Sequence, residues 1–166
     1  MVHTGGFIAL LILGLPAWAA PGIRNFHEVD PGIYRGAQPT SEGFEYLAKL
    51  GVKLVIDLRE PGERSRAEER VVAAAGMRYL NVPMSGLAAP TRTQANKILA
   101  LLEDPSAGPV FVHCMRGADR TGAVIAAYRI DHDNWNSARA LNEAFANGMS
   151  WFQYPRQHFI RVFQGR

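Results

Sequence analysis

The sequence predicts a single α/β domain, in which a mostly parallel central sheet is flanked by helices and the C-terminal half of the chain is helical. Up to residue 113, short apolar segments typical of buried strands alternate with amphipathic segments typical of helices. After residue 113 only helical patterns follow. The 166 residues are 48% hydrophobic and 20% charged, with no internal repeat or low-complexity tract, which indicates one compact domain.

The N-terminal part of the chain is expected to form a hairpin, two helices and two strands. Alternating apolar residues flank the turn sequence Asp30-Pro31-Gly32, which favours a hairpin over residues 25–38. The segment Pro39-Thr40-Ser41 can open a helix that carries apolar residues at helical spacing and ends at Gly51. The next expected elements are a buried strand at 53–58, a helix at 63–75 and a strand at 78–82.

The second half is expected to contain one more strand and four helices. Thr91 and Gln94 have capping-box spacing at the start of a helix that ends before Pro105. Val110–His113 is a short apolar strand that leads directly to the single cysteine, Cys114. Further helices are predicted at 121–130, from an Asn136 cap through Phe145, and from Tyr154-Pro155 with Phe159, Val162 and Phe163 facing inward.

Composition excludes several classes of function. Eighteen Lys and Arg against 15 Asp and Glu give a net charge of +3, and the basic residues are scattered, so no nucleic-acid partner is expected. One cysteine excludes an intrachain disulfide and any multi-cysteine metal cluster. His27, His132 and His158 have no spacing typical of ligands, so we expect neither a metal nor a cofactor.

Residues 1–19 are predicted to be a signal peptide, and residues 20–166 the folded domain. The apolar run from Phe7 to Leu15 is too short to span a membrane, and Ala17-Trp18-Ala19 provides a cleavage site before Ala20. We therefore expect export, with a periplasmic location and no stable membrane span after cleavage. No Lys or Arg precedes the apolar run, so an uncleaved N-terminal anchor or a misassigned start codon stays an alternative.

The loop after the last strand carries the chemistry. Backbone N–H groups from Met115 to Arg120 can converge on one point at a helix N-terminus, where the helix dipole also favours an anion. The Arg120 guanidinium can fold back and hold two oxygens of a tetrahedral anion. The residues expected to bind phosphate are Met115, Arg116, Gly117, Ala118, Asp119 and Arg120.

The same positive environment is expected to activate Cys114. A helix N-terminus and nearby cations lower a thiol pKa, and the resulting thiolate would be a nucleophile at the base of the anion cradle. Thr121 can donate its hydroxyl to the sulfur, and His113 can order the loop from the strand side. The alternative is that Cys114 is a small apolar residue buried in the core, but that role would not require the anion-binding loop around it.

The run His113-Cys114-x2-Gly117-x2-Arg120-Thr121-Gly122 resembles the signature of cysteine-based protein tyrosine phosphatases, particularly the small dual-specificity group. Residues 32–39, 55–59 and 135–145 are similar to segments of bacterial dual-specificity-like phosphatases. The resemblance implies the protein tyrosine phosphatase fold and a metal-independent reaction on a phosphorylated protein or a small phosphomonoester. It also implies that Cys114 forms a cysteinyl-phosphate intermediate and that Arg120 stabilises the transferring phosphoryl group.

One part of the family pattern is missing. The family supplies an Asp from a separate loop to protonate the leaving oxygen, but the corresponding segment here, 81–93, contains no acid. Asp119 is the expected substitute, or it orients Arg120. The alternatives are Glu60 or Glu63, whose other role is a solvated helix start, and Asp57 near the end of its strand.

Two other functions stay open at this point. The missing acid is compatible with a phosphate-binding module that has little turnover. A rhodanese-like sulfurtransferase also uses one cysteine in an anion-holding loop, although the Arg120-Thr121-Gly122 ending argues against it.

Several residues near the matched segments have two interpretations. Arg35 and Arg59 either border the phosphate site or form surface salt bridges. Trp135, Trp151 and Phe152 are expected to pack in the core or between helices rather than to form a substrate platform.

Overall fold

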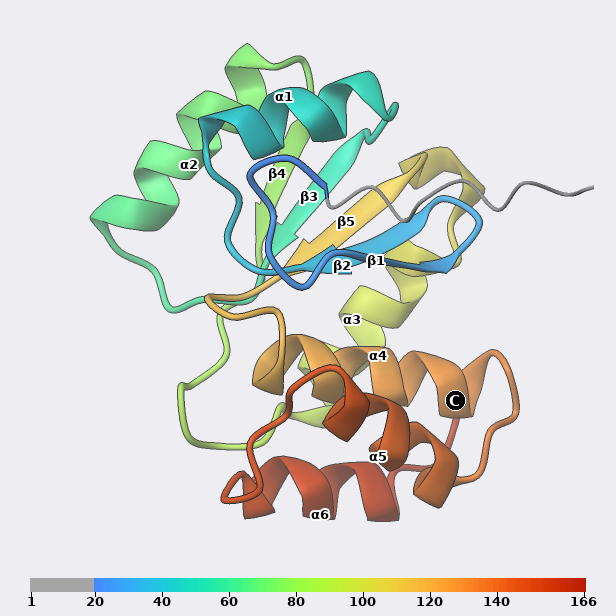
Figure 1. Cartoon of the computed structure of the whole chain (residues 1–166). Helices are drawn as coiled ribbons and strands as arrows, with labels where there is room; N and C mark the ends of the chain where they lie inside the picture. The colour runs from blue at the N-terminus through green and yellow to red at the C-terminus, as the bar shows by residue number, and fades with distance from the viewer. Residues whose placement is uncertain (1–19) are drawn as a thin grey trace, which may run out of the picture.

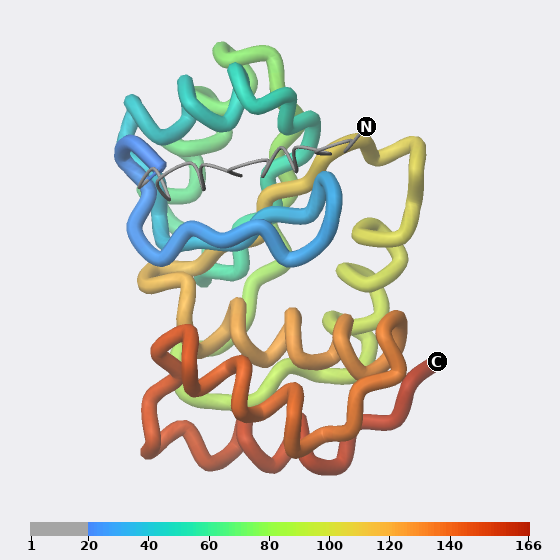
Figure 2. The backbone as a smooth tube through the Cα atoms, turned by 45° about the vertical axis from the view of Figure 1, so that its right-hand side comes forward, coloured from blue at the N-terminus to red at the C-terminus, as the bar shows by residue number. Residues whose placement is uncertain are grey.

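The computed structural model describes residues 20–166, so the predicted signal peptide at 1–19 lies outside the described part of the chain. The five strands form one sheet in the order β1-β2-β5-β3-β4, with β5 at its centre (Figures 1 and 2). The β1–β2 hairpin is antiparallel and the other pairings are parallel, as predicted. The strands are β1 His27–Asp30, β2 Ile33–Gly36, β3 Leu54–Asp57, β4 Arg78–Asn81 and β5 Val110–His113.

Helices cover both faces of this sheet (Figure 1). On one face lie α1 Ser41–Lys49 and α2 Glu63–Ala74. On the other lie α3 Arg92–Leu102, α4 Asp119–Asp131, α5 Ser137–Ala146 and α6 Tyr154–Val162, and a short 3₁₀ turn at Pro105–Ala107 leads into β5. Within residues 20–166, no helix combines the length and the apolar character that crossing a membrane requires. The predicted fold class, with its helical C-terminal half, is confirmed.

The central strand β5 serves two cores at once. Val110 and Val112 face the large core beneath α3–α6, while Phe111 faces the smaller core beneath α1 and α2. Side chains alternate between the two faces of a strand, so a strand buried on both sides must be apolar throughout. Because β5 is buried on both faces, its position in the sheet is fixed, and so is the position of Cys114, which follows it directly.

The predicted helix caps are present. Thr91 Oγ1 accepts from the Gln94 N–H at 3.1 Å, and Gln94 Oε1 accepts from the Thr91 N–H at 2.8 Å, which completes the capping box. Asn136 caps α5 by accepting from the Arg139 N–H at 2.9 Å. Helix α4 begins at Asp119, two positions before the predicted Thr121, because the loop turns directly into the helix.

Three apolar residues expected to face inward are exposed. Trp151, Phe152 and Val162 keep 73%, 53% and 56% of their accessible surface. The segment between α5 and α6 is held by its backbone instead, since the Gln157 amide donates to the Trp151 carbonyl at 2.8 Å. The prediction of packing was wrong for these residues. It is confirmed for Trp135, which packs against the large core.

Candidate active site

Cys114 lies at the carboxyl end of β5, in the middle of the sheet. Ligands of α/β proteins bind at this end of parallel strands, and the loop from Cys114 to Ala118 runs directly into the N-terminus of α4. The thiol is buried, with 2% of the residue accessible. The predicted loop residues are therefore brought together at one sheet edge, beside a helix N-terminus.

The backbone of this loop supplies unsatisfied donors. Among the residues described, the N–H groups of 115–118 donate to no backbone or side-chain oxygen, and that of Arg116 bonds to the Cys114 sulfur. Gly117 has φ of +67°, and a Cβ at this position would lie 2.3 Å from the carbonyl carbon of Gly36. The glycine lets the loop pack against the end of β2, which leaves its amides available to an anion at the N-terminus of α4.

Two side chains brace the loop from below. The Asn25 amide nitrogen donates to the carbonyls of Gly117 at 3.1 Å and Arg116 at 3.3 Å. Arg35 is almost fully buried, and its Nη2 donates to the Gly117 carbonyl at 2.7 Å. Burial lowers the pKa of Arg35 to about 10, partly offset by the charges of Glu143 and Cys114. Arg35 thus supports the loop at residues 114–120, called the phosphate loop below, and the surface salt-bridge interpretation was wrong.

The surroundings of Cys114 favour the thiolate by lowering the pKa of its thiol. Burial alone would raise the pKa of Cys114, but hydrogen bonding from the side chain and backbone of Thr121 and the charge of Arg120 lower it below the ordinary value. The Thr121 hydroxyl is buried and forms no hydrogen bond with a nitrogen or oxygen of the described residues, which leaves it free to donate to the sulfur. Its part in the reaction stays a prediction. A lowered thiol pKa in an electropositive pocket is typical of a reactive cysteine.

A buried ion-pair network lies next to the loop. Glu68 of α2 accepts from His113 Nε2 at 2.7 Å and from Arg59 Nη2, which also binds Asp57 at 2.8 Å. Tyr79 donates to Asp57 at 2.7 Å. Burial would lower the pKa of His113, but its hydrogen bond to Glu68 raises it. Asp57, Glu68 and His113 could together ligate a metal, but Arg59 already satisfies both carboxylates.

This network settles two further interpretations. Arg59 is 6% exposed and forms buried ion pairs beside the loop, so it is not a surface salt bridge. The Asp57 carboxylate is also fully buried, and hydrogen bonds from Arg59 hold its pKa below the ordinary value despite its burial. It is therefore held as an anion, and a role as proton donor does not fit.

Asp119 has different partners from those expected. Its Oδ1 accepts from the Ser150 N–H at 2.8 Å, and its Oδ2 accepts from Arg116 at 2.5 Å. Burial raises the pKa of Asp119, but these bonds outweigh it and lower the pKa overall. Asp119 therefore orients Arg116 and the segment before α6, not Arg120 as expected. The prediction from the sequence that Asp119 donates a proton to the leaving group is untested, and these hydrogen bonds favour its ionised form.

The acid-free loop lies against Arg120. Arg120 Nη1 donates to the Met84 carbonyl at 3.4 Å, which places the segment after β4 beside the phosphate loop. A pocket of about 190 Å³ is lined by Arg59, Glu60, Arg64, Met115 and Arg120. Of the carboxylates considered as substitutes for the missing acid, Glu60 is the one that shares this pocket with Arg120.

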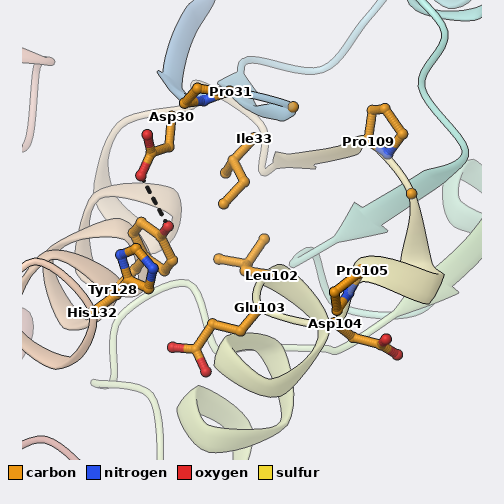
Figure 3. Close-up of a pocket in the computed structure, with 12 residues that line it drawn as sticks. Asp30, Pro31, Ile33, Leu102, Glu103, Asp104, Pro105, Pro109, Tyr128 and His132 are labelled. Atoms are coloured by element: carbon orange, nitrogen blue, oxygen red, sulfur yellow. Dashed lines mark hydrogen bonds between the residues drawn. The ribbon is translucent and has the colours of Figure 1, made fainter.

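The pocket in Figure 3 is remote from this chemistry. It has a volume of about 490 Å³ and lies where β2 and β5 begin, at the opposite end of the sheet from Cys114. Asp30 and Tyr128 face each other there across a 3.1 Å hydrogen bond (Figure 3). No residue of the phosphate loop lines it, so its size does not identify it as the reaction site.

Residues 22–161 match a family described as DSP-PTPase phosphatase fused to NAD+ kinase. The chain belongs to this family. The matched range includes every strand of the sheet, the phosphate loop and the residues that brace the loop. The resemblance to cysteine-based protein tyrosine phosphatases of the bacterial dual-specificity group is confirmed.

Named relatives and solved structures agree with this PTP-NADK family membership. "Dual specificity protein phosphatase TpbA" of Pseudomonas aeruginosa strain PAO1 is 32% identical over 135 residues, covering 77% of this chain and 57% of TpbA. "Inositol diphosphatase SIW14" of Saccharomyces cerevisiae is 30% identical over 150 residues, covering 84% of this chain and 51% of that protein. This chain therefore spans only part of the length of these curated relatives.

The fold has close structural counterparts. The core catalytic domain of the PP-IP phosphatase SIW14 from S. cerevisiae, solved with citrate, has a TM-score of 0.77 and 27% identity, covering 88% of this chain and 89% of that one. A TpbA variant from P. aeruginosa, solved with pTyr, has a TM-score of 0.67 and 25% identity over 83% of each chain. Both belong to phosphatases, which confirms the predicted architecture.

Sequence reasoning missed Asn25, Glu68 and Arg156 as residues near the site. Asn25 has φ of +53°, but an Asn before a strand carries no pattern that reveals this. Glu68 sits in a charged helical segment that looks solvated in sequence, and it is buried against Arg59, just after β3, and His113 of β5.

Proposed function

We propose that this chain is a phosphatase that hydrolyses phosphomonoesters through a cysteinyl-phosphate intermediate on Cys114. The observation that carries the proposal is a buried thiol of lowered pKa at the base of a loop whose amides are free to bind an anion. Family membership and the phosphatase relatives support it.

In the first step the Cys114 thiolate attacks phosphorus while the bond to the leaving oxygen breaks. Arg120 and the N–H groups of 115–118 hold the non-bridging oxygens and stabilise the charge on the transferring phosphoryl group. The leaving oxygen takes a proton from a carboxylic acid or from solvent. Because segment 81–93 contains no acid, substrates whose leaving group needs little protonation should react fastest.

In the second step water attacks phosphorus and the P–S bond breaks. Phosphate leaves, the sulfur recovers its electron pair as a thiolate, and one proton passes to solvent or to a nearby carboxylate. The Thr121 hydroxyl can donate to the departing sulfur, which stabilises the thiolate that forms. Thr121 is thereby assigned to the hydrolysis of the intermediate.

Aryl phosphates such as phosphotyrosine are the substrates that these features favour. An aryl leaving group requires the least protonation, which suits a loop without an acid. Exposed aromatic rings of Trp151, Phe152 and Tyr154 follow Ser150, whose backbone contacts the phosphate loop through Asp119. Such rings can pack against an apolar or aromatic substrate group. The solved complex of TpbA with pTyr is consistent with this class.

An inositol pyrophosphate is the second candidate class. SIW14 is described as an inositol diphosphatase, and its catalytic core is similar in structure to this chain. Exposed Arg64 shares the pocket of Arg120, and exposed Arg24 lines another pocket beside Arg116, so further phosphates would find cations. Asp119 neutralises Arg116, however, which weakens this field at the loop itself.

The decisive experiment compares Cys114→Ser and Arg120→Met with the wild type, using p-nitrophenyl phosphate in the presence of reductant. Arg161→Met is a matched control, because Arg161 is exposed on α6 and forms no ion pair within the described residues. We expect both site variants to lose turnover, with Cys114→Ser still binding phosphate. Unchanged turnover in Cys114→Ser would rule out the mechanism.

Assays of the wild-type protein distinguish the alternative functions and the two substrate classes. Phosphopeptide or phosphate binding without any product burst on aryl phosphates would indicate a binding module. Thiosulfate:cyanide transfer faster than phosphate release would indicate a sulfurtransferase. A higher kcat/KM for an inositol pyrophosphate than for phosphotyrosine would select the second substrate class.

We also propose that residues 1–19 direct export and are removed before Ala20. The short apolar run and the Ala17-x-Ala19 site support this. N-terminal sequencing of the protein recovered from the periplasmic fraction tests it, because an uncleaved anchor would retain Met1. In an oxidising compartment the lone Cys114 has no resolving cysteine in its chain, so activity should depend on reductant.

A further inference from the structure

Arg156 is a fully buried guanidinium that the proposed mechanism does not use. It lies in the first turn of α6, with 0% of the residue accessible. Its Nη2 donates to the Ser85 carbonyl at 2.6 Å, and its Nη1 contacts the Leu87 carbonyl at 3.5 Å and the Gln153 side-chain oxygen. Its Nε has no partner among the residues described. Both backbone carbonyls that this cation contacts belong to the loop after β4, and its third acceptor, Gln153, precedes α6.

No carboxylate lies within ion-pair distance of Arg156 in the described part of the chain. Burial lowers the pKa of Arg156, while the charges of Asp119 and of the Cys114 thiolate favour the cation. A buried charge without an ion-pair partner is costly, so its hydrogen-bond acceptors must hold it in place. Two backbone carbonyls and one amide oxygen do so here.

The loop that Arg156 contacts is fastened at several successive carbonyls. Gln94 of α3 donates to the Pro83 carbonyl at 2.6 Å, and Arg120 of α4 contacts the Met84 carbonyl at 3.4 Å. Arg156 of α6 then takes the carbonyls of Ser85 and Leu87. Side chains from three helices therefore hold residues 83–87 beside the phosphate loop, and one of them is the catalytic arginine.

We propose that Arg156 is a positioning residue whose forked guanidinium fixes residues 84–87 against Arg120 and thereby sets the position from which Arg120 meets the transferring phosphoryl group. This inference rests on the proposed phosphatase function for its kinetic consequence. A displacement of about 1 Å in a catalytic group can reduce turnover on the order of 100-fold.

The test uses Arg156→Lys and Arg156→Met in the full chain, with Arg161→Met as the exposed control on the same helix. Lysine keeps the charge but cannot donate in a fork to two carbonyls and an amide. We expect kcat for p-nitrophenyl phosphate to fall about 10- to 100-fold in both variants. KM should change less than about threefold, because the amides of 115–118 bind the ground-state phosphate.

Hydrogen exchange of residues 81–93 provides a readout that does not depend on catalysis. We expect faster exchange there in both variants, with exchange in β5 unchanged. Gln153→Leu, which removes one acceptor of the guanidinium, should shift both readouts in the same direction by a smaller amount. If circular dichroism shows that an Arg156 variant does not fold, Gln153→Leu still tests the positioning role of Arg156.

The outcomes separate the two proposals. A folded Arg156→Lys with kcat within twofold of Arg161→Met, or with wild-type exchange in 81–93, would overturn the positioning role. A wild-type protein without phosphatase activity would overturn the proposed function instead, and faster exchange in the Arg156 variants would then still show that the guanidinium holds the loop.

Discussion

Glu68→Gln should destabilise the protein strongly, because Glu68 is the shared anion of the buried ion-pair network beside the Cys114 loop. The carboxylate is 4% exposed and accepts from His113 at 2.7 Å, from Gln38 at 2.8 Å and from Arg59. Glutamine keeps the shape but removes the charge, and its NH₂ group faces other donors. Two buried cations then lose their shared anion, which leaves Asp57 to compensate Arg59 alone.

The expected magnitude follows from this burial. Removing one partner of a buried ion pair costs about 3–5 kcal/mol, and Gln retains one acceptor, so we expect about 3 kcal/mol. For a domain of this size each kcal/mol lowers the melting temperature by about 2–4 °C, so the midpoint should fall roughly 6–12 °C. Glu69→Gln, an exposed change at the next position of α2, should shift the midpoint little.

The loss of stability in Glu68→Gln should depend on pH, because Glu68 raises the pKa of His113. Glu68 raises the pKa of His113 above its ordinary value of 6.5, so the stability that the protonated imidazole contributes is complete below about pH 6.5 and is lost as pH rises through the raised value. The difference in unfolding free energy between wild type and Glu68→Gln, measured in urea, should therefore narrow from pH 6 to pH 9. A constant difference, or one below 0.5 kcal/mol at pH 6, would refute the reasoning.

Three further predictions concern the site itself. Thr121→Val should raise the pKa of Cys114, because the hydroxyl lowers it, and should move the acid limb of the kcat/KM profile to higher pH. Gly117→Ala should lower stability by about 1–3 kcal/mol and reduce phosphate binding, since the new Cβ would meet the β2 backbone; wild-type affinity would contradict this. Among aryl phosphates of rising leaving-group pKa, Glu60→Gln should show a loss that steepens, because Glu60 shares a pocket with Arg120. Asp119→Asn should show a loss independent of leaving group, because Asp119 is paired with Arg116, and the reverse pattern would assign the donor to Asp119.

The parts of the molecule that the sequence predicted are those determined locally. The run from Val110 to Gly122 contains a strand, an anion-binding loop and a helix start in one contiguous stretch, so neighbouring residues suffice to place Cys114 beside Arg120. The capping box at Thr91 is likewise a short-range hydrogen-bond pattern. Such features need no knowledge of which elements become neighbours in space.

The residues that the sequence did not predict make contacts with residues far away in the sequence. Asn25 reaches across 92 positions to Gly117, and Arg156 reaches across 71 to Ser85. Single-sequence periodicity carries no information on such pairings, and polar residues in these segments look like ordinary surface residues. The exposed Trp151 escaped for a related reason, because its backbone rather than its ring is held.

This division has a consequence for catalysis. The local run contains the proposed nucleophile and phosphate ligands. Asn25, Arg35 and Glu68 contact this run from other elements, and Arg156 holds the neighbouring segment at Ser85. Substitutions in the second group should therefore change kcat or stability while leaving the identity of the nucleophile intact. Since each of these four contacts ends on a backbone carbonyl or on a buried charge, shape-conserving substitutions that lose the donor or the charge should have nearly the full effect. The proposed reaction is carried by residues of one loop, whereas side chains outside it hold that loop and its neighbouring segment in place.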